Sequence, residues 1–424
     1  MSATKIKKAA LAYSGGLDTS IIIPWLKENY GCEVVAVAVD VGQAEETSGL
    51  KEKALATGAC DFHLIDAREE FAAEYLWPVL RAGAVYEHEY LLGTSTARPL
   101  IAKKQVEIAL VTGCDALSHG CTGKGNDQVR FELSYLAIDP SIKIISPWKD
   151  KDFLAAFQGR PDLLAYAASH GIDVKASREK PYSEDANLIH ISHESGILED
   201  PRTAPAEEVF SWTRSPQSAP DSETRLEIQF KDGAPVRVTN LGSGAVTTGP
   251  AAILAALNAV GAENGIGRVD MVENRFVGIK SRGIYETPGM TILRAAHMDI
   301  EGIAMDREVM RLRDMLSPKF AELVYNGFWF SPEMDFLMAA VNKSQEVVDG
   351  VVRLTLYKGN VTVTGRESPS SLYDQALSSM DIEGGFNQQD SRGFIAINAV
   401  RLMAHNAIMT RRGRKVTDFM GNGQ

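Results

Sequence analysis

The chain has 424 residues, of which 45% are hydrophobic and 23% are charged. This composition is typical of a globular protein and argues against a disordered chain, and the length is enough for two or three domains. The formal net charge of −11 argues against general binding to nucleic acid, because phosphate backbones are held by an excess of lysine and arginine.

The four cysteines, at positions 32, 60, 114 and 121, have neither the spacing of a metal site nor that of a disulfide framework. We interpret them as thiols that pack as small hydrophobic groups. No stretch approaches the roughly twenty apolar residues that span a bilayer, and the segment MSATKIKK has no apolar signal-peptide core. We therefore expect a cytoplasmic protein with no membrane partner and no nucleic-acid partner.

The first part of the chain alternates short apolar runs with stretches long enough for a crossover helix. The runs are AALAY (9–13), VVAVAVD (34–40), FHLIDA (62–67), ALSHG (116–120) and KIISP (143–147). Because the runs are almost continuously apolar, both faces of their sheet should be buried, which is typical of parallel strands. The pattern predicts a doubly wound α/β domain over residues 1–172, with ligands at the carboxyl ends of its strands. The segment 152–171 is predicted to be helical with a break near 159–161.

From about residue 173 the pattern changes. The stretch 198–223 has four prolines and little periodicity, so it is predicted to be a long surface excursion rather than a core element. Segments 226–239 and 351–364 predict β-hairpins, and the segment 249–265 predicts a helix. We therefore expect an α+β domain over residues 173–385.

The remaining segment, 386–424, is predicted to contain one helix over about 391–415 with a basic end. Spacings of mostly three or four residues predict a single apolar stripe on it. The stripe residues are Phe394, Ile397, Val400, Met403 and Ile408. The stripe could dock onto its own chain or onto another subunit, and the sequence leaves both open.

The segment AYSGGLDTS (12–20) lies between the first predicted strand and the first predicted helix. Its glycines let a phosphate approach the backbone, and a helix N-terminus supplies unpaired N–H groups and partial positive charge. The alternative is an ordinary glycine turn in which Asp18 or Thr19 caps the helix. No Walker-type lysine follows, so we expect magnesium to help neutralise the phosphates. Pro24 is expected to kink the helix.

Five strings in the chain carry a family resemblance. SGGLDTS after a first strand resembles the pyrophosphate-binding loop of the N-type ATP pyrophosphatases. YLLGTSTARPLIAKKQVEIA, SHGCTGKGNDQVRFE, VENRFVGIKSRGIYETPGMTIL and GRESPSSLYD resemble the argininosuccinate synthase family, and the similarity covers nearly the whole chain. The resemblance implies ATP-dependent ligation of L-citrulline to L-aspartate through a citrullyl adenylate, with AMP and pyrophosphate as products. It also implies a step of arginine biosynthesis and a homotetramer with a C-terminal oligomerisation helix.

The resemblance further implies which residues contact each substrate. ATP would contact Ala12, Tyr13, Ser14, Gly15, Gly16, Leu17, Asp18, Thr19, Ser20, Val39 and Gly120. Citrulline would contact Tyr90, Ser95, Asn126, Arg130, Ser183, Ser192, Glu273 and Tyr285. Aspartate would contact Thr94, Thr122, Asn126 and Asp127. No protein ligand to a metal and no general base is assigned, and Mg²⁺ is expected to bind through the phosphates.

Two of these residues make chemical sense by themselves. A carboxylate such as Asp127 can pair with an α-ammonium group, and Arg130 can bind a carboxylate in a forked geometry. Their spacing is equally that of a surface ion pair on a helix. Lys124 is a candidate phosphate partner or a solvated loop lysine.

Two other functions are consistent with the loop alone. A tRNA thiolase or a glutamine-dependent amidotransferase would carry reactive cysteine pairs or a glutaminase domain, and the sequence has neither. A non-catalytic nucleotide-binding protein would not need Asn126, Asp127, Arg130 and Glu273 together.

Overall fold

The computed structural model describes residues 5–43, 47–172, 182–379 and 385–417. These residues form two compact units, 1–370 and 371–424, which we describe separately. The boundary predicted between residues 172 and 173 adjoins 173–181, which lie outside the described residues, and so do residues 380–384 near the second predicted boundary.

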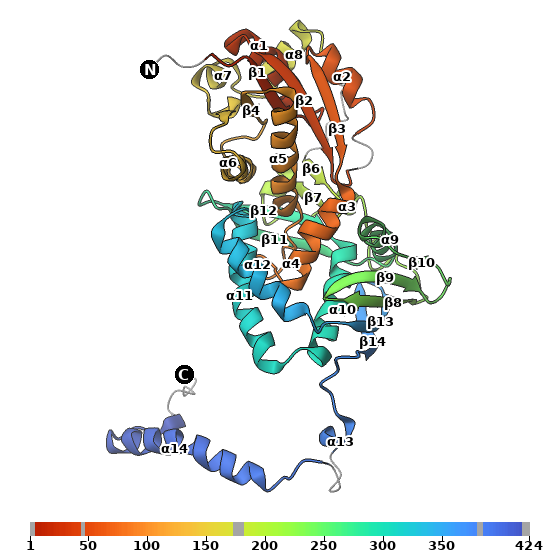
Figure 1. Cartoon of the computed structure of the whole chain (residues 1–424), viewed down its shortest axis with the longest axis vertical. Helices are drawn as coiled ribbons and strands as arrows, with labels where there is room; N and C mark the ends of the chain where they lie inside the picture. Colours follow the sequence, from red (N-terminus) through yellow and green to blue (C-terminus); the bar gives the residue numbers. More distant parts are fainter. Residues whose placement is uncertain (1–4, 44–46, 173–181, 380–384, 418–424) are drawn as a thin grey trace. The chain divides into compact units, whose positions relative to one another are not determined.

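The first unit begins with a five-stranded parallel sheet in the order β3-β2-β1-β4-β5 (Figure 1). Its strands are β1 (Lys8–Ala12), β2 (Glu33–Asp40), β3 (Asp61–Asp66), β4 (Ala116–Ser118) and β5 (Lys143–Ile145). The five apolar runs therefore form the predicted strands, and the order is that of a doubly wound sheet. The prediction for this part of the fold is confirmed.

Helices cover both faces of the sheet, because apolar side chains project from both faces of its strands. In β2, Val35 and Val37 pack into one core, whereas Val34 and Ala36 pack into the other, as the period of two along a strand requires. The helices are α1 (Leu17–Tyr30), α2 (Leu50–Ala56), α5 (Gly93–Thr112), α6 (Asp127–Ile138), α7 (Lys151–Ala156) and α8 (Arg160–Ser169). The break predicted near 159–161 separates α7 from α8, and α1 remains helical through the buried Pro24.

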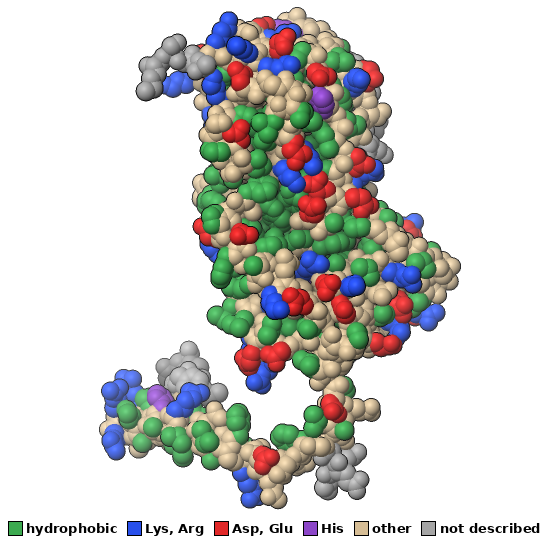
Figure 2. All heavy atoms as spheres, in the orientation of Figure 1, with side chains coloured by type: hydrophobic (Ala, Val, Ile, Leu, Met, Phe, Trp, Pro, Cys, Tyr) green, Lys and Arg blue, Asp and Glu red, His purple; other side chains and the backbone are tan. Residues whose placement is uncertain are grey.

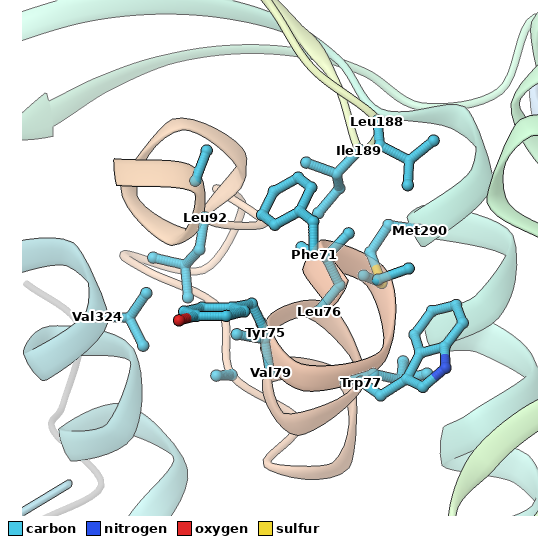
Figure 3. Close-up of a cluster of buried hydrophobic side chains, with 14 of the residues drawn as sticks. Phe71, Tyr75, Leu76, Trp77, Val79, Leu92, Leu188, Ile189, Met290 and Val324 are labelled. Atoms are coloured by element: carbon cyan, nitrogen blue, oxygen red, sulfur yellow. The ribbon is translucent and has the colours of Figure 1, made fainter. Parts of the chain in front are cut away.

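One helical segment joins this sheet to the rest of the unit. It comprises α3 (Arg68–Glu70), the π-helix η2 (Phe71–Leu76) and α4 (Trp77–Arg81). Figure 3 shows Phe71, Tyr75 and Leu76 in the middle of a dense apolar cluster, with Leu188 and Met290 from later in the chain around them. Burying each such side chain contributes about 1.5–3 kcal/mol, so the early and late parts of the unit share one core.

The later part of the first unit has two antiparallel sheets. The larger has the order β10-β9-β8-β13-β14 and contains both predicted hairpins. Its strands are β8 (Thr224–Lys231), β9 (Ala234–Asn240), β10 (Val246–Thr247), β13 (Gly350–Tyr357) and β14 (Asn360–Glu367). The smaller, in the order β11-β12-β7-β6, was not predicted because two of its strands have four residues each. Its strands are β6 (Ser183–Ala186), β7 (Ile191–Glu194), β11 (Arg268–Asn274) and β12 (Lys280–Glu286).

This part also has four helices, of which the first two pack on the larger sheet and the last two pack on each other and on α5 and α4. They are α9 (Pro250–Glu263), α10 (Pro288–Ala304), α11 (Arg307–Asn326) and α12 (Pro332–Gln345). The helix predicted over 249–265 is α9, and the α+β class of this part is confirmed. Apolar side chains of all four helices belong to the core that also contains Phe71 and Leu76.

Residues 198–223 are irregular and mostly exposed, as their prolines predict, but a few buried side chains anchor them to the rest of the unit. Leu198 and Val209 are buried and pack with Ile284 of β12 in a small core of their own. The stretch contains the short 3-10 helices η4 (Gly196–Glu199) and η5 (Glu207–Val209). It therefore belongs to the packed structure although it is irregular.

The buried carboxylate of Glu286 holds this stretch in place. The backbone N–H groups of Ser211, Trp212 and Thr213 donate to its oxygens at 2.6–3.2 Å, and His193 Nε2 lies 2.9 Å from Oε1. Burial acts to raise the pKa of Glu286, but hydrogen bonds from His193 and Thr213 outweigh burial and lower the pKa. The stretch is thus held by a side chain distant in sequence. The local sequence pattern could not predict such a contact.

The second unit contains α13 (Gln375–Ser378) and α14 (Asp390–Arg411). The predicted terminal helix is present, but its apolar side chains do not form a single stripe, because Ile395 and Leu402 lie on other sides of it. Positions spaced by three residues also drift by about 60° per step. Figure 2 shows apolar side chains along α14, and Phe394 is 71% exposed. Across the described residues, no helix combines the length and apolar character needed to cross a bilayer.

We predict that Glu286→Gln lowers the free energy of unfolding by about 3 kcal/mol, because it removes a buried charge and leaves backbone donors without an acceptor. Limited proteolysis should then cut within 198–223 faster than in the unsubstituted protein. Glu263→Gln is the matched control, since Glu263 pairs with Arg214 at the surface and its loss should change stability by at most about 0.5 kcal/mol. Equal cleavage of both variants would contradict this role.

Candidate active site

The loop after β1 has the geometry of an anion-binding turn. Gly15 has a φ of +76°, in the region that favours glycine. The helix α1 starts at Leu17, and no side chain caps its first turn, so neither Asp18 nor Thr19 acts as the ordinary cap. Ser14 Oγ lies 3.4 Å from the backbone nitrogen of Gly16, from which it accepts a hydrogen bond. The first N–H groups of α1 are therefore available to a phosphate.

The predicted ATP residues lie at one edge of the sheet. The strand β1 lies between β2 and β4, where the direction of strand addition reverses, and ligands of such sheets bind beside this point. A Cβ on Gly120 would lie 2.9 Å from Thr19 Cγ2, so the end of β4 packs directly against the start of α1. Val39 lies near the end of β2, and its carbonyl accepts a 2.7 Å hydrogen bond from Gln43 Nε2.

Tyr90 is arranged as a hydrogen-bond donor at the start of α5. Its hydroxyl oxygen accepts the backbone N–H groups of Thr94 at 3.0 Å and Ser95 at 3.4 Å. Burial raises the pKa of Tyr90 to about 12, so the phenol keeps its proton at neutral pH. Its ring lies 4.7 Å from that of Tyr285. Because the oxygen already accepts two backbone N–H groups, the phenol can donate its own hydrogen to a further acceptor.

Asp127, the first residue of α6, is held by two arginines. Arg98 Nε donates to Oδ2 and Arg130 Nη1 donates to Oδ1, each at 2.9 Å. Arg130 Nε also donates to the carbonyl of Tyr325 at 2.8 Å. Burial acts to raise the pKa of Asp127, but the charges of Arg98 and Arg130 outweigh it and lower the pKa. The carboxylate is therefore anionic, and its pair with Arg130 joins a buried guanidinium to a partly buried carboxylate rather than being a surface ion pair.

The amide of Asn126 has a defined orientation. Its Oδ1 accepts the backbone N–H of Phe276 at 2.9 Å, in the turn between β11 and β12. A backbone N–H can only donate, so the oxygen must face Phe276 and the NH₂ group must face away. Asn126 thus offers donors to a ligand carboxylate.

Glu273 is a buried carboxylate with an open oxygen. Its side chain is 6% exposed, and Oε2 has no hydrogen-bond partner among the described residues. Burial raises the pKa of Glu273, while the charge of Arg130 acts in the opposite direction. Because an isolated buried carboxylate is costly, this site is suited to a cationic ligand group.

The other predicted contacts are divided between the interior and the surface. Ser192 is buried in β7 and donates to the carbonyl of Asp185 at 3.3 Å, and Thr94 donates to Asp185 Oδ2 at 3.1 Å. Ser183 is exposed on β6, and Thr122 is exposed in the loop before α6. Most of the residues predicted to bind the amino acids are thus brought to the junction of α5, α6 and the smaller antiparallel sheet.

Four further residues at this junction were not predicted. Arg98 and Asp185 form an ion pair of 2.6 Å, His190 Nε2 lies 3.0 Å from Thr94 Oγ1, and Tyr325 contacts Arg130. The spacing between Thr94 and Arg98 on a predicted helix could have identified Arg98, because residues four apart share a face. No comparable signal was available for the other three.

Family models match most of the chain. Residues 8–173 match the model described as Arginosuccinate synthase N-terminal HUP domain, and residues 182–405 match the model described as Arginosuccinate synthase C-terminal domain. The helices α5 and α6 therefore fall within one model, and the smaller antiparallel sheet falls within the other model of the same family.

Curated relatives agree over nearly the full length. Argininosuccinate synthase from Thermotoga sp. (strain RQ2) is 60% identical over 95% of this chain and 98% of the relative. The argininosuccinate synthase from Pseudothermotoga lettingae is 58% identical over 99% of this chain and 100% of the relative. The one from Syntrophus aciditrophicus is 56% identical over 94% of this chain and 98% of the relative. The chain therefore belongs to the argininosuccinate synthase family, a group of ATP-dependent carbon–nitrogen ligases.

Proposed function

We propose that the chain joins L-citrulline to L-aspartate with ATP, releasing AMP and pyrophosphate. We also propose that the residues predicted to contact ATP, citrulline and aspartate bind these substrates. The observation that carries the proposal is the open carboxylate of Glu273 in the field of Arg130. An α-amino acid has one ammonium and one carboxylate group, and these two side chains supply the complementary charges. Arg130 Nη2 has no hydrogen-bond partner among the described residues, which leaves it for the citrulline carboxylate.

In the first half-reaction, the ureido oxygen of citrulline is the nucleophile. This oxygen attacks the α-phosphorus of ATP, the bond to the bridging oxygen breaks, and pyrophosphate leaves with the electron pair. The N-terminus of α1 with Gly15 and Gly16 stabilises the negative charge of the leaving group by backbone donors. Tyr90 donates its proton in a hydrogen bond to citrulline.

The second half-reaction joins the two amino acids. The amine of aspartate attacks the activated ureido carbon, and AMP leaves. Asp127 binds the α-ammonium before it loses its proton, while Asn126, Thr94 and Thr122 bind the carboxylates by hydrogen bonds. Positioning the amine beside the adenylate accelerates the step, because it makes the encounter of the two reactants effectively unimolecular.

The loop residues fit a magnesium ion bound mainly by phosphates. Their side-chain donors are oxygens, from Ser14, Asp18 and Thr19, which is the ligand type Mg²⁺ prefers. In the described part of the chain no group of three or more His, Cys, Asp or Glu side chains could hold a metal by itself. When bound, Mg²⁺ would neutralise part of the phosphate charge.

We also propose that the protein is a cytoplasmic homotetramer assembled through α14. No residue of α14 is buried, and its large apolar side chains are exposed. Exposed apolar surface of this kind marks an interaction site in soluble proteins. A second subunit would cover these side chains, and the family resemblance favours that partner.

Pyrophosphate release tests the proposed function directly. The purified protein is mixed with ATP, Mg²⁺, citrulline and aspartate, and each amino acid is left out in turn. We expect steady release of pyrophosphate only when both amino acids are present. Release that is independent of either amino acid would refute the proposal.

We predict that Glu273→Gln raises the KM for citrulline about tenfold or more, because it removes a charged partner of the ammonium group. In the unsubstituted protein, falling pH protonates Glu273 at its raised pKa, so the KM for citrulline should rise on the acid side. The variant should lose this pH dependence, whereas Glu367→Gln at the exposed end of β14 should keep it. An unchanged pH dependence in Glu273→Gln would exclude the assigned role.

We predict that deleting the chain after residue 388 dissociates the tetramer, since the deletion removes α14. Light scattering of the full chain and of the truncated chain measures the change in mass. A truncated protein with the oligomeric state of the full chain would show that α14 docks onto its own subunit or onto nothing.

A further inference from the structure

Arg98 lies between Asp127, which is proposed to bind aspartate, and Asp185. It is on α5, one helical turn after Thr94, and its side chain is 16% exposed. Its Nε donates to Asp127 Oδ2 at 2.9 Å, and its Nη2 donates to Asp185 Oδ2 at 2.6 Å. One guanidinium group thus bridges a carboxylate on α6 and a carboxylate on β6.

This bridge controls more than two side chains. Asp185 Oδ2 also accepts the hydroxyl of Thr94 at 3.1 Å. Arg98 therefore fixes Asp127 directly and Thr94 through Asp185. The planar guanidinium can donate in two directions at once, whereas a lysine ammonium is a point charge that cannot reproduce this fork.

Arg98 also compensates the negative charges of Asp127 and Asp185, so that Arg130 is not the sole positive partner of Asp127. Asp127 shares its two oxygens between Arg98 and Arg130. Without Arg98, Asp127 would be held from one side only, by Arg130. Asp127 and Asp185 would also lose the positive charge that each of them contacts, and like charges repel.

We propose that Arg98 is a positioning residue for the aspartate subsite, which holds Asp127 and Thr94 in the geometry that receives the aspartate ammonium group. The inference rests on the proposed function and goes beyond its contact residues. Arg98 acts through these two side chains, so it serves the second half-reaction more than the first.

The test compares Arg98→Lys with Arg268→Lys. Arg268 is a matched control because its side chain is also 16% exposed, and its fork binds Glu207 and Thr213 away from the site. Citrulline-dependent exchange of labelled pyrophosphate into ATP measures the first half-reaction without aspartate. Steady-state kinetics measure the KM for aspartate.

We expect Arg98→Lys to raise the KM for aspartate about tenfold or more while exchange changes by no more than about twofold. Asp127→Asn should shift the same KM, and Arg268→Lys should leave both quantities near those of the unsubstituted protein. An unchanged KM for aspartate, or equal losses of exchange and overall activity, would overturn the inference. If the unsubstituted protein itself releases no pyrophosphate with both amino acids, the proposed function fails instead.

Chemical rescue gives a second readout. Arg98→Ala is assayed with methylguanidinium and with methylammonium at equal ionic strength, below denaturing concentrations. We expect methylguanidinium to restore aspartate-dependent turnover several-fold, because it can occupy the fork between Asp127 and Asp185. No gain over methylammonium in a variant that still catalyses exchange would overturn the inference.

Discussion

The row of alternating charges Asp185–Arg98–Asp127–Arg130 is the interaction on which the site depends. Each charge is partly or fully removed from water, so each must be compensated by its neighbours. The row therefore ties α5 and α6 of the parallel-sheet region to β6 of the smaller antiparallel sheet. The residues proposed to bind the amino acids come together only where these elements meet, so a nucleotide-binding sheet alone would not be sufficient for the proposed function.

The arrangement also separates the tasks of the site. In the proposed function, the loop after β1 binds phosphate through the backbone groups of an uncapped helix start, without a Walker lysine. The proposed recognition of the amino acids uses complementary charges: Glu273 is open to an ammonium group, and Asn126 is turned so that its NH₂ group faces away from Phe276. A bond can then form between two small substrates without a covalent intermediate on the protein.

Much of the fold could be predicted from sequence because its signals are local. Continuous apolar runs predicted the five parallel strands, and turn residues predicted both hairpins. The exposed course of residues 198–223 followed from their prolines, but the anchoring of their N–H groups by Glu286 did not, because Glu286 is far along the chain. For the site, local physics favoured a phosphate loop after the first strand, whereas Glu273 and Tyr285 followed only from family resemblance. An isolated Glu or Tyr has no local signature, since its role comes from burial and from neighbours such as Arg130.

The proposed mechanism requires the oxygen of the citrulline ureido group to attack the α-phosphorus. Citrulline carrying oxygen-18 in this group provides the test. The protein is incubated with labelled citrulline, ATP and aspartate, and the products are examined by mass spectrometry. We expect AMP to carry the label in its phosphate and pyrophosphate to be unlabelled. Unlabelled AMP together with labelled pyrophosphate or labelled water would contradict the mechanism.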